Sequence, residues 1–287
     1  MRLKTRKMDE EAVVGIVVTV LLIGLAVSVT VMVNNVYVPQ WTEQQEAAHM
    51  DQVANQFASF KQNVDLQAMI GQETSLSSWF TLGSQELPIL GSGRTFGRLA
   101  LFEDQYNMTI HSDNDESEIF TYSLGSLKFE AGNSYFVPQH YTYENGALIL
   151  QQYDANMLIG KPTFFVTTYG QNLSFTIIDL NSTLGKRTAS GYGITAVQTQ
   201  VKDIENQVIT LVKNLTVHTN YPYAWTIALN STLKEVDSGF GSDDYHITRS
   251  ADSVTLSFID TGKDPAYPNL NIKKVKMFTQ IAPGWIE

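Results

Sequence analysis

The side chains that could carry metal or acid–base chemistry are scattered along this chain of 287 residues. No two histidines have the His-Glu-x-x-His spacing that places two metal ligands on one helix face. Cysteine is absent, which excludes disulfides, thiolate catalysis and Cys-type zinc sites. No Gly-x-Ser-x-Gly phrase marks a serine nucleophile. We therefore expect no catalytic site and no cofactor, and we interpret the five histidines as solvated or singly hydrogen-bonded: His49, His111, His140, His218 and His246.

One acidic stretch is the best candidate for a metal site. Residues 113–118 read Asp-Asn-Asp-Glu-Ser-Glu and gather the oxygen ligands that calcium accepts, with Asp113, Asp115 and Glu118 as the candidate ligands. The stretch lacks the central glycine and the distal glutamate of a calcium loop, so a solvated acidic turn is the alternative. Residues 237–244 form a similar but weaker pattern. Two carboxylates remote in sequence could still pair for glycoside hydrolysis, although no feature points to such a pair.

Five Asn-x-Ser/Thr triplets are acceptors for N-glycosylation if this part of the chain is exported. The alternative is that they are ordinary asparagines of turns and strands. Their asparagines are Asn107, Asn172, Asn181, Asn214 and Asn230.

Aromatic side chains offer a second kind of recognition surface. If exposed together, they would form an adhesive or sugar-stacking face, but core packing is the expected use for most of them. The set comprises Tyr135, Phe136, Tyr141, Tyr143, Tyr221, Tyr223 and Trp225.

The N-terminus has the pattern of a membrane anchor. Residues 1–11 carry a basic cluster followed by three acids, and the 22 residues from Ala12 to Val33 are uncharged and apolar. About 20 such residues suffice to cross the hydrocarbon layer. Positive residues stay on the cytoplasmic side, so we expect a cytoplasmic N-terminus and an extracellular C-terminal domain. The sequence predicts a transmembrane helix over residues 12–35, in contact with membrane lipid.

A second helix is expected over residues 36–70. Apolar residues recur at spacings of three and four, with polar residues such as Gln52, Asn55 and Gln56 between them. That spacing forms one apolar stripe, suited to lie against a globular domain. Pro39 should kink or interrupt the helix between its two halves, because proline lacks an N–H and clashes with the preceding turn. The stripe consists of Met50, Val53, Phe57, Phe60 and Val64.

Residues 71–287 have the pattern of a β-rich extracellular domain. Short runs of β-forming residues alternate with turn residues, and Asn145-Gly146 between apolar flanks is the best hairpin signal. One helix is expected, from Tyr223 to Val236 after Pro222. The fold class we expect is α+β: a long N-terminal helix followed by an antiparallel β-sandwich-like domain. Strands are expected at 98–102, 107–110, 119–122, 141–150, 163–168, 173–180, 208–218, 254–259 and 272–278.

The charge balance excludes one class of partner. The formal net charge is −10, and binding to a phosphate backbone requires a basic face. We therefore expect no nucleic-acid partner.

The head of the chain resembles the N-terminal region of archaeal type IV pilin-like proteins. The resemblance is carried by residues 6–18, in which a basic leader and a short polar junction precede an apolar helix that opens with Ala12-Val13 and Gly15. The rest of the chain resembles archaeal membrane-anchored surface proteins of pilin type, through residues 126–137, 143–147 and 214–225.

This resemblance implies a subunit or accessory component of a surface filament. A leader peptidase would remove the basic segment, and the apolar helices would pack as homo- or hetero-oligomers in the filament core with the β domains outside. Family leaders often end in glycine, where this chain has Lys7 and Met8 as cleavage candidates. Without cleavage, the chain would be a single-pass surface protein whose β domain binds a glycan, a cation or a protein partner.

Overall fold

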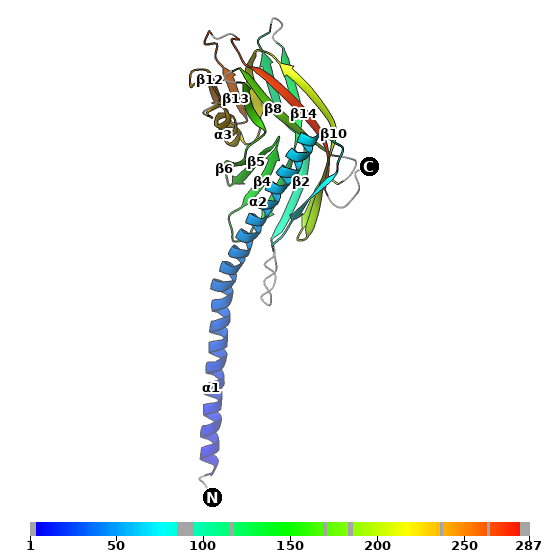
Figure 1. Ribbon diagram of the computed structural model, residues 1–287. Helices are drawn as coiled ribbons and strands as arrows, with labels where there is room; N and C mark the ends of the chain where they lie inside the picture. The colour runs from blue at the N-terminus through cyan, green and yellow to red at the C-terminus, as the bar shows by residue number, and fades with distance from the viewer. Residues whose placement is uncertain are drawn as a thin grey trace.

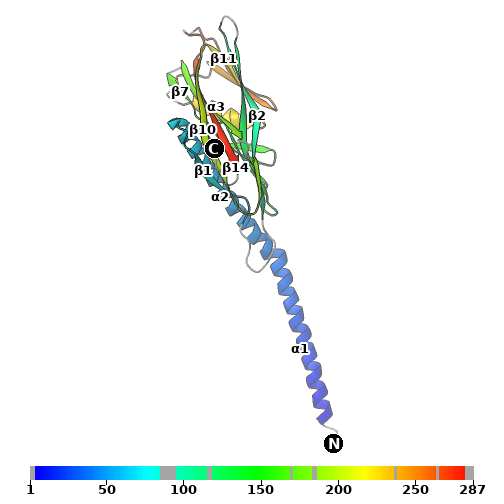
Figure 2. The same cartoon turned by 90° about the vertical axis from the view of Figure 1, so that its right-hand side faces the viewer.

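The computed structural model describes residues 4–84, 95–114, 118–168, 171–182, 186–235, 238–262 and 265–281. It consists of a long N-terminal helix and a β-rich domain, and the C-terminal half of the helix lies along that domain (Figure 1). The N-terminal half extends away from the domain without contacting it, which Figure 2 shows from the side.

The long helix is continuous through the position of the proline. Helix α1 (Lys4–Met32) runs into a π-helical segment, η1 (Val33–Tyr37), and then into α2 (Val38–Ile70). The Val38 N–H donates to the Val33 carbonyl across this wide turn. Pro39, expected to kink or interrupt the helix, lies in the first turn of α2. The wider π turn just before it accommodates a residue that has no N–H to donate, so the helix continues.

The apolar stripe on α2 is buried as predicted. Met50, Val53, Phe57, Phe60 and Val64 are all at most 1 % exposed. Phe60 lies edge-on to Tyr143, with ring centroids 5.2 Å apart, and packs beside Phe80. These contacts attach the helix to the β domain.

The described strands form two sheets. One has the order β1-β10-β14-β8-β7, and the other has the order β12-β13-β11-β2-β3-β4-β5-β6, with β9 paired to β2. The described pairs are antiparallel except β14–β8, which is parallel and was not expected from the sequence. The bounds are β1 (Leu76–Thr81), β2 (Phe96–Ser112), β3 (Ile119–Gly132), β4 (Gln139–Glu144), β5 (Ala147–Gln152), β6 (Ala155–Gly160), β7 (Phe164–Thr168), β8 (Asn172–Ser182), β9 (Thr188–Gly191), β10 (Ile194–Ile209), β11 (Val212–His218), β12 (Tyr245–Arg249), β13 (Ser253–Phe258) and β14 (Asn269–Ile281).

Two hydrophobic clusters fill the domain, and both sheets contribute to each. The first cluster lies around helix α3 (Pro222–Leu233), whose Trp225 is fully buried. The second joins the stripe of α2 to Leu127 and Phe129 of β3 and to Val275 of β14. The α2 helix is therefore a structural part of the second core.

Three strand predictions were wrong in their boundaries. The expected strand at 208–218 is the end of β10 and all of β11, separated by a turn in which Leu211 has a φ of 52°. The expected strands at 98–102 and 107–110 are one strand, β2, whose register shifts between Phe102 and Tyr106. A bulge of this kind interrupts the alternating pattern without ending the strand.

The predicted hairpin is present at β4–β5. Asn145 and Gly146 have φ angles of 46° and 79°, the left-handed values that a tight two-residue turn needs. Asn145 is fully buried, and its Oδ1 accepts a hydrogen bond of 2.6 Å from the Ile178 N–H. The turn therefore also ties β5 to the other sheet.

We predict that Phe60→Ala lowers the free energy of unfolding by about 3–5 kcal/mol, because it leaves a cavity at the helix–domain interface. Leu66→Ala is the matched control on the same helix, since Leu66 is 47 % exposed. It should change the free energy by less than about 1 kcal/mol. Denaturant unfolding of the full chain measures both, and equal effects would contradict this packing.

Candidate functional site: a bare apolar helix and a groove beside α2

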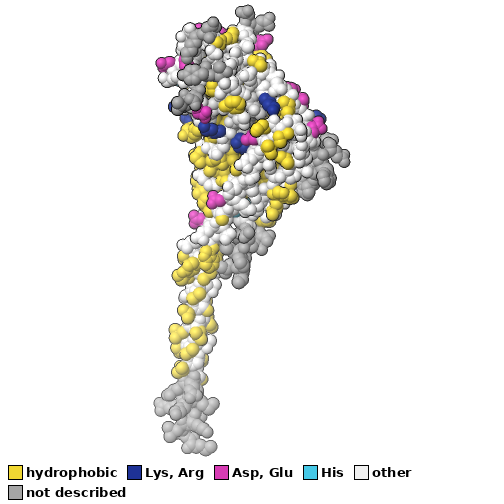
Figure 3. Space-filling model, in the orientation of Figure 1, with side chains coloured by type: hydrophobic (Ala, Val, Ile, Leu, Met, Phe, Trp, Pro, Cys, Tyr) yellow, Lys and Arg dark blue, Asp and Glu magenta, His cyan; other side chains and the backbone are white. Residues whose placement is uncertain are grey.

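The most distinctive surface is the apolar part of α1. Its large apolar side chains from Val13 to Met32 are 48 % to 67 % exposed. Figure 3 shows these side chains along the extended helix. The helix is long and apolar enough to cross a membrane. In water such a surface carries a large hydrophobic cost, so it requires a lipid or protein environment.

The few hydroxyl groups in this segment are satisfied within the helix. Thr19, Ser28 and Thr30 each donate a 2.8 Å hydrogen bond to the carbonyl four residues earlier. These bonds spare the hydroxyls the cost of remaining unpaired in an apolar medium. The segment therefore presents no unsatisfied side-chain polar group to its surroundings.

A buried carboxylate fastens α2 to the β3–β4 loop. Glu46 is 1 % exposed and accepts hydrogen bonds of 2.6 to 2.8 Å from the backbone N–H groups of Ser134, Tyr135 and Phe136. The Thr95 hydroxyl donates a fourth bond at 3.3 Å. Hydrogen bonds to an ionised carboxylate are roughly twice as strong as neutral ones. We call this set the Glu46 clamp.

Amide side chains of α2 cover the open edge of β1. The Thr81 N–H donates to Gln56 Oε1 at 3.0 Å, and Gln56 Nε2 donates to Thr81 Oγ1 at 2.9 Å. Further along, Asn63 Nδ2 donates to Ser78 Oγ at 2.9 Å. At Thr81 the Gln56 amide thus takes the place of a neighbouring strand, at an edge that would otherwise be open to pairing.

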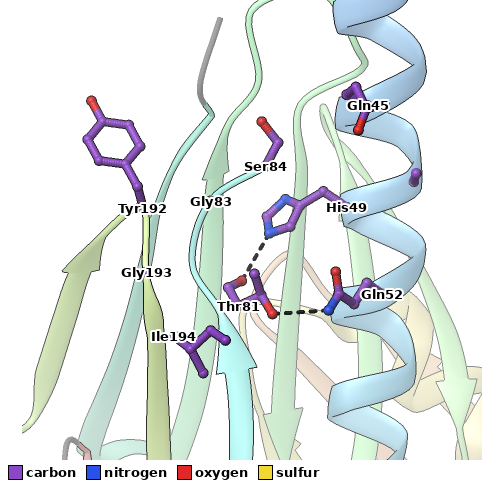
Figure 4. A pocket seen from close by; sticks show the side chains of 10 residues that line it. Gln45, His49, Gln52, Thr81, Gly83, Ser84, Tyr192, Gly193 and Ile194 are labelled. Atoms are coloured by element: carbon purple, nitrogen blue, oxygen red, sulfur yellow. Dashed lines mark hydrogen bonds between the residues drawn. The ribbon is translucent and has the colours of Figure 1, made fainter. Parts of the chain in front are cut away.

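A groove runs between this polar face of α2 and the β1 edge. It comprises two hollows of about 710 Å³ and 760 Å³, which share Ala48 and Gln52. Figure 4 shows the first hollow, with His49 and Gln52 of α2 facing Thr81 and Gln45 further along the helix. We call it the α2–β1 groove. Its lining is Gln45, Ala48, His49, Asp51, Gln52, Asn55, Gln56, Ser59, Asn63, Ser77, Ser78, Trp79, Thr81, Gly83, Ser84, Tyr192, Gly193 and Ile194.

His49 is one of the buried polar side chains of this groove, with Ser78 and Ser84. Its Nε2 donates to the Thr81 carbonyl at 2.9 Å, so Nδ1 of the neutral ring is an acceptor. Burial lowers the pKa of His49, against the opposing effects of the Thr81 bond and of Glu46. Nδ1 is buried and has no hydrogen-bond partner among the described residues. A buried acceptor without a donor is rare in native proteins.

A second buried acid lies away from the groove. Glu144, at the end of β4, is 1 % exposed, and its Oε2 accepts hydrogen bonds from Thr219 Oγ1 at 2.8 Å and Trp225 Nε1 at 3.0 Å. Burial raises the pKa of Glu144 to about 7, although both hydrogen bonds act to lower it. It connects the hairpin to α3 and borders a small hollow that Lys128 also lines.

The structure does not bring the predicted metal ligands together. Asp113 pairs with Lys213, with 2.9 Å between Oδ1 and Nζ, and Asp115 and Asp237 lie outside the described residues. The carbonyl of Glu118 accepts from the Ser112 N–H. His111, His140, His218 and His246 lie on four different strands. Among the described residues, no group of three His, Asp or Glu side chains could hold a metal ion.

The five glycosylation candidates differ in accessibility. Asn107 is exposed on β2. Asn172 and Asn230 accept hydrogen bonds through their side-chain oxygens from Asn269 and Tyr245. The Asn181 amide nitrogen is buried, and Asn214 is half-buried on β11. Asn107 is therefore the most open acceptor of the five.

The aromatic set separates into core and surface members. Tyr141, Tyr143, Tyr221 and Trp225 are buried, and Phe136 is half-buried. The other two members, Tyr135 and Tyr223, are exposed. Core packing is therefore the use of most of these residues, as expected.

The α2–β1 groove was not identified from the sequence. The sequence predicts Gln52, Asn55 and Gln56 only as the polar face of an amphipathic helix. The run of uncharged amides on that face was the available signal, but strand β1 opposite it was not predicted. The cleavage candidates Lys7 and Met8 have helical backbone in α1, and their side chains lie outside the described residues.

Comparisons with known proteins give no family assignment for the chain. No protein-family model, curated protein or solved structure matches it.

We predict that Glu46→Gln lowers the free energy of unfolding by about 2–3 kcal/mol, because an amide group would turn N–H donors toward the loop N–H groups. Glu43→Gln is the matched control, an exposed acid less than one turn away. It should change the free energy by no more than about 0.5 kcal/mol. Denaturant titration of the two full-length variants tests this, and indistinguishable midpoints would contradict the clamp.

We predict a pH-dependent stability contribution from Glu144. The folded carboxyl keeps its proton up to about pH 7, whereas an unfolded glutamate releases it near 4.5, so the folded state binds more protons between these values. Stability from this residue therefore falls as pH rises through that window, by about 3 kcal/mol in total. Glu144→Gln removes the titration and keeps an acceptor for Thr219 and Trp225.

The measurement is the unfolding free energy of both proteins between pH 4 and 8. The wild-type value minus the variant value should decline across the window. A constant difference would show that Glu144 does not titrate there.

Proposed function

We propose that this protein is a structural subunit or accessory component of an archaeal type IV pilus-like surface filament, inserted in the membrane before assembly. The observation that carries the proposal is the bare apolar helix, Val13–Met32, continuous with a helix half that belongs to the domain core. The pilin-like sequence of residues 6–18 supports the same interpretation.

The two halves of the helix support this function in different ways. The exposed half satisfies its own hydroxyls and requires an apolar environment, which lipid supplies first and sister helices supply after assembly. The buried half is fixed to the domain by its apolar stripe and by the Glu46 clamp. A load on the anchor would therefore reach the β domain through packed side chains.

The proposed topology places the β domain outside the cell. The basic cluster at residues 2–7 keeps the N-terminus cytoplasmic. The exposed Asn107 would then be open to glycosylation. The contribution of both sheets to shared cores supports the description of this domain as sandwich-like.

We predict that Val20→Asp prevents assembly through the helix, because a charge at the middle of the apolar run costs about 2.5–3.5 kcal/mol in the membrane and is unpaired in a helix bundle. Val20→Leu is the matched control and should assemble normally. Cross-linking and electron microscopy of native surface material measure assembly. Normal assembly of the Val20→Asp protein would overturn the filament proposal.

The second candidate function is an uncleaved, single-pass surface protein whose β domain binds a glycan, a cation or a protein partner. The α2–β1 groove favours this alternative. The mass of the mature N-terminus separates the two functions. A start at Met8 or Asp9 supports processing and assembly, whereas retention of Met1, or loss of Met1 alone, supports the anchored binding protein.

A further inference from the structure

We propose that the α2–β1 groove is a binding site for a neutral oligosaccharide. The proposal deepens the second candidate function and rests on the groove alone. Its failure would leave the role of the apolar helix in assembly untouched, because the two are measured by different experiments.

The lining of the groove is polar but nearly uncharged. Asp51 is the one charged residue among the described residues that line the two hollows. Amide and hydroxyl side chains can both donate and accept hydrogen bonds, which matches the hydroxyl groups of a sugar. A phosphate or a strongly acidic ligand would find no cation in this lining, so the chemistry favours an uncharged, hydroxyl-rich ligand.

Three polar groups of the groove have no hydrogen-bond partner among the described residues. The side chains of Gln45 and Asn55 make no hydrogen bond with any described residue, although both line the hollows. The third such group is the buried His49 Nδ1, an acceptor at the groove wall. A ligand hydroxyl is a donor of the right kind for Nδ1, and Gln45 lies one turn away on the same helix.

Aromatic side chains flank the polar lining. Trp79 borders the second hollow and is 63 % exposed, and Tyr192 borders the first and is 49 % exposed. An exposed aromatic ring offers a flat face on which the C–H groups of a sugar ring can pack. Trp79 is therefore the stacking ring of the groove, since Figure 4 shows the Tyr192 ring pointing away from His49 and Gln52. Two adjoining hollows of this size suit an oligosaccharide of several units better than a single sugar.

A peptide is the less suitable ligand. Extended peptides commonly bind by adding a strand to an open sheet edge, through backbone hydrogen bonds. Here both backbone groups of Thr81 are already bonded to α2, the N–H to Gln56 Oε1 and the carbonyl to His49 Nε2. The β1 edge is therefore occupied by side chains of α2 at Thr81, which disfavours strand addition there.

The experiment uses the full chain in phosphatidylcholine nanodiscs, which avoids sugar-based detergents. Maltohexaose, cellohexaose and chitohexaose are titrated with calorimetry and tryptophan fluorescence as readouts. At least one should bind saturably and change the fluorescence. Trp79→Ala should weaken that binding about tenfold, and Gln45→Ala about three- to tenfold.

Trp41→Ala is the matched control, because Trp41 is an exposed tryptophan outside the groove, on the same long helix. It should leave the affinity unchanged, and the unfolding midpoints of all variants should match that of the wild type. The proposal is overturned if none of the three hexasaccharides binds, or if binding survives Trp79→Ala and Gln45→Ala. Equal or tighter binding of hexagalacturonate, or of an extended peptide, would also overturn it.

Discussion

The whole structure depends on one helix whose two halves bury their apolar side chains differently, one half inside the domain and the other not within this chain. From Met50 to Val64 its apolar stripe is fully buried in the second core, and from Val13 to Met32 its apolar surface is bare. Burial of each Phe or Met side chain contributes about 1.5–3 kcal/mol to the free energy of folding, so detaching the C-terminal half of the helix would strongly destabilise the domain. The N-terminal half needs an equivalent environment from outside the chain. Because the helix is continuous through η1, the position of the buried half in the domain also fixes the direction of the exposed half.

The polar contacts of α2 decide how the helix sits on the domain. An apolar stripe alone fixes which face is buried, but it tolerates small shifts along the helix axis. Glu46 at one end and Gln67 at the other fix the position, since Gln67 bonds to Thr74 and Thr199. Between them, the side-chain amides of Gln56 and Asn63 form hydrogen bonds to Thr81 and Ser78 of β1. This bridging holds the strand edge at a distance from the helix, which leaves the α2–β1 groove.

The sequence predicts the features that depend on local periodicity. The apolar run, the buried stripe, the Asn145-Gly146 hairpin and α3 follow from residue spacing and turn chemistry, and the structure contains each of them. The Glu46 clamp could not be predicted, because its partners are backbone groups 88 to 90 residues away in a loop. The parallel β14–β8 pair likewise depends on long-range topology.

The amide residues of the α2–β1 groove can be identified in the sequence, but their position opposite strand β1 cannot be predicted from it. A helix face of uncharged amides has the same pattern whether it meets water or a strand edge, and only the position of β1 distinguishes the two. Because the groove and the anchor share one continuous helix, the groove keeps a fixed direction relative to the apolar segment. A ligand bound there would lie on the helix half that is continuous with the bare apolar segment. In the proposed functions, recognition and anchoring would be linked by the helix itself, which is continuous from α1 through η1 to α2.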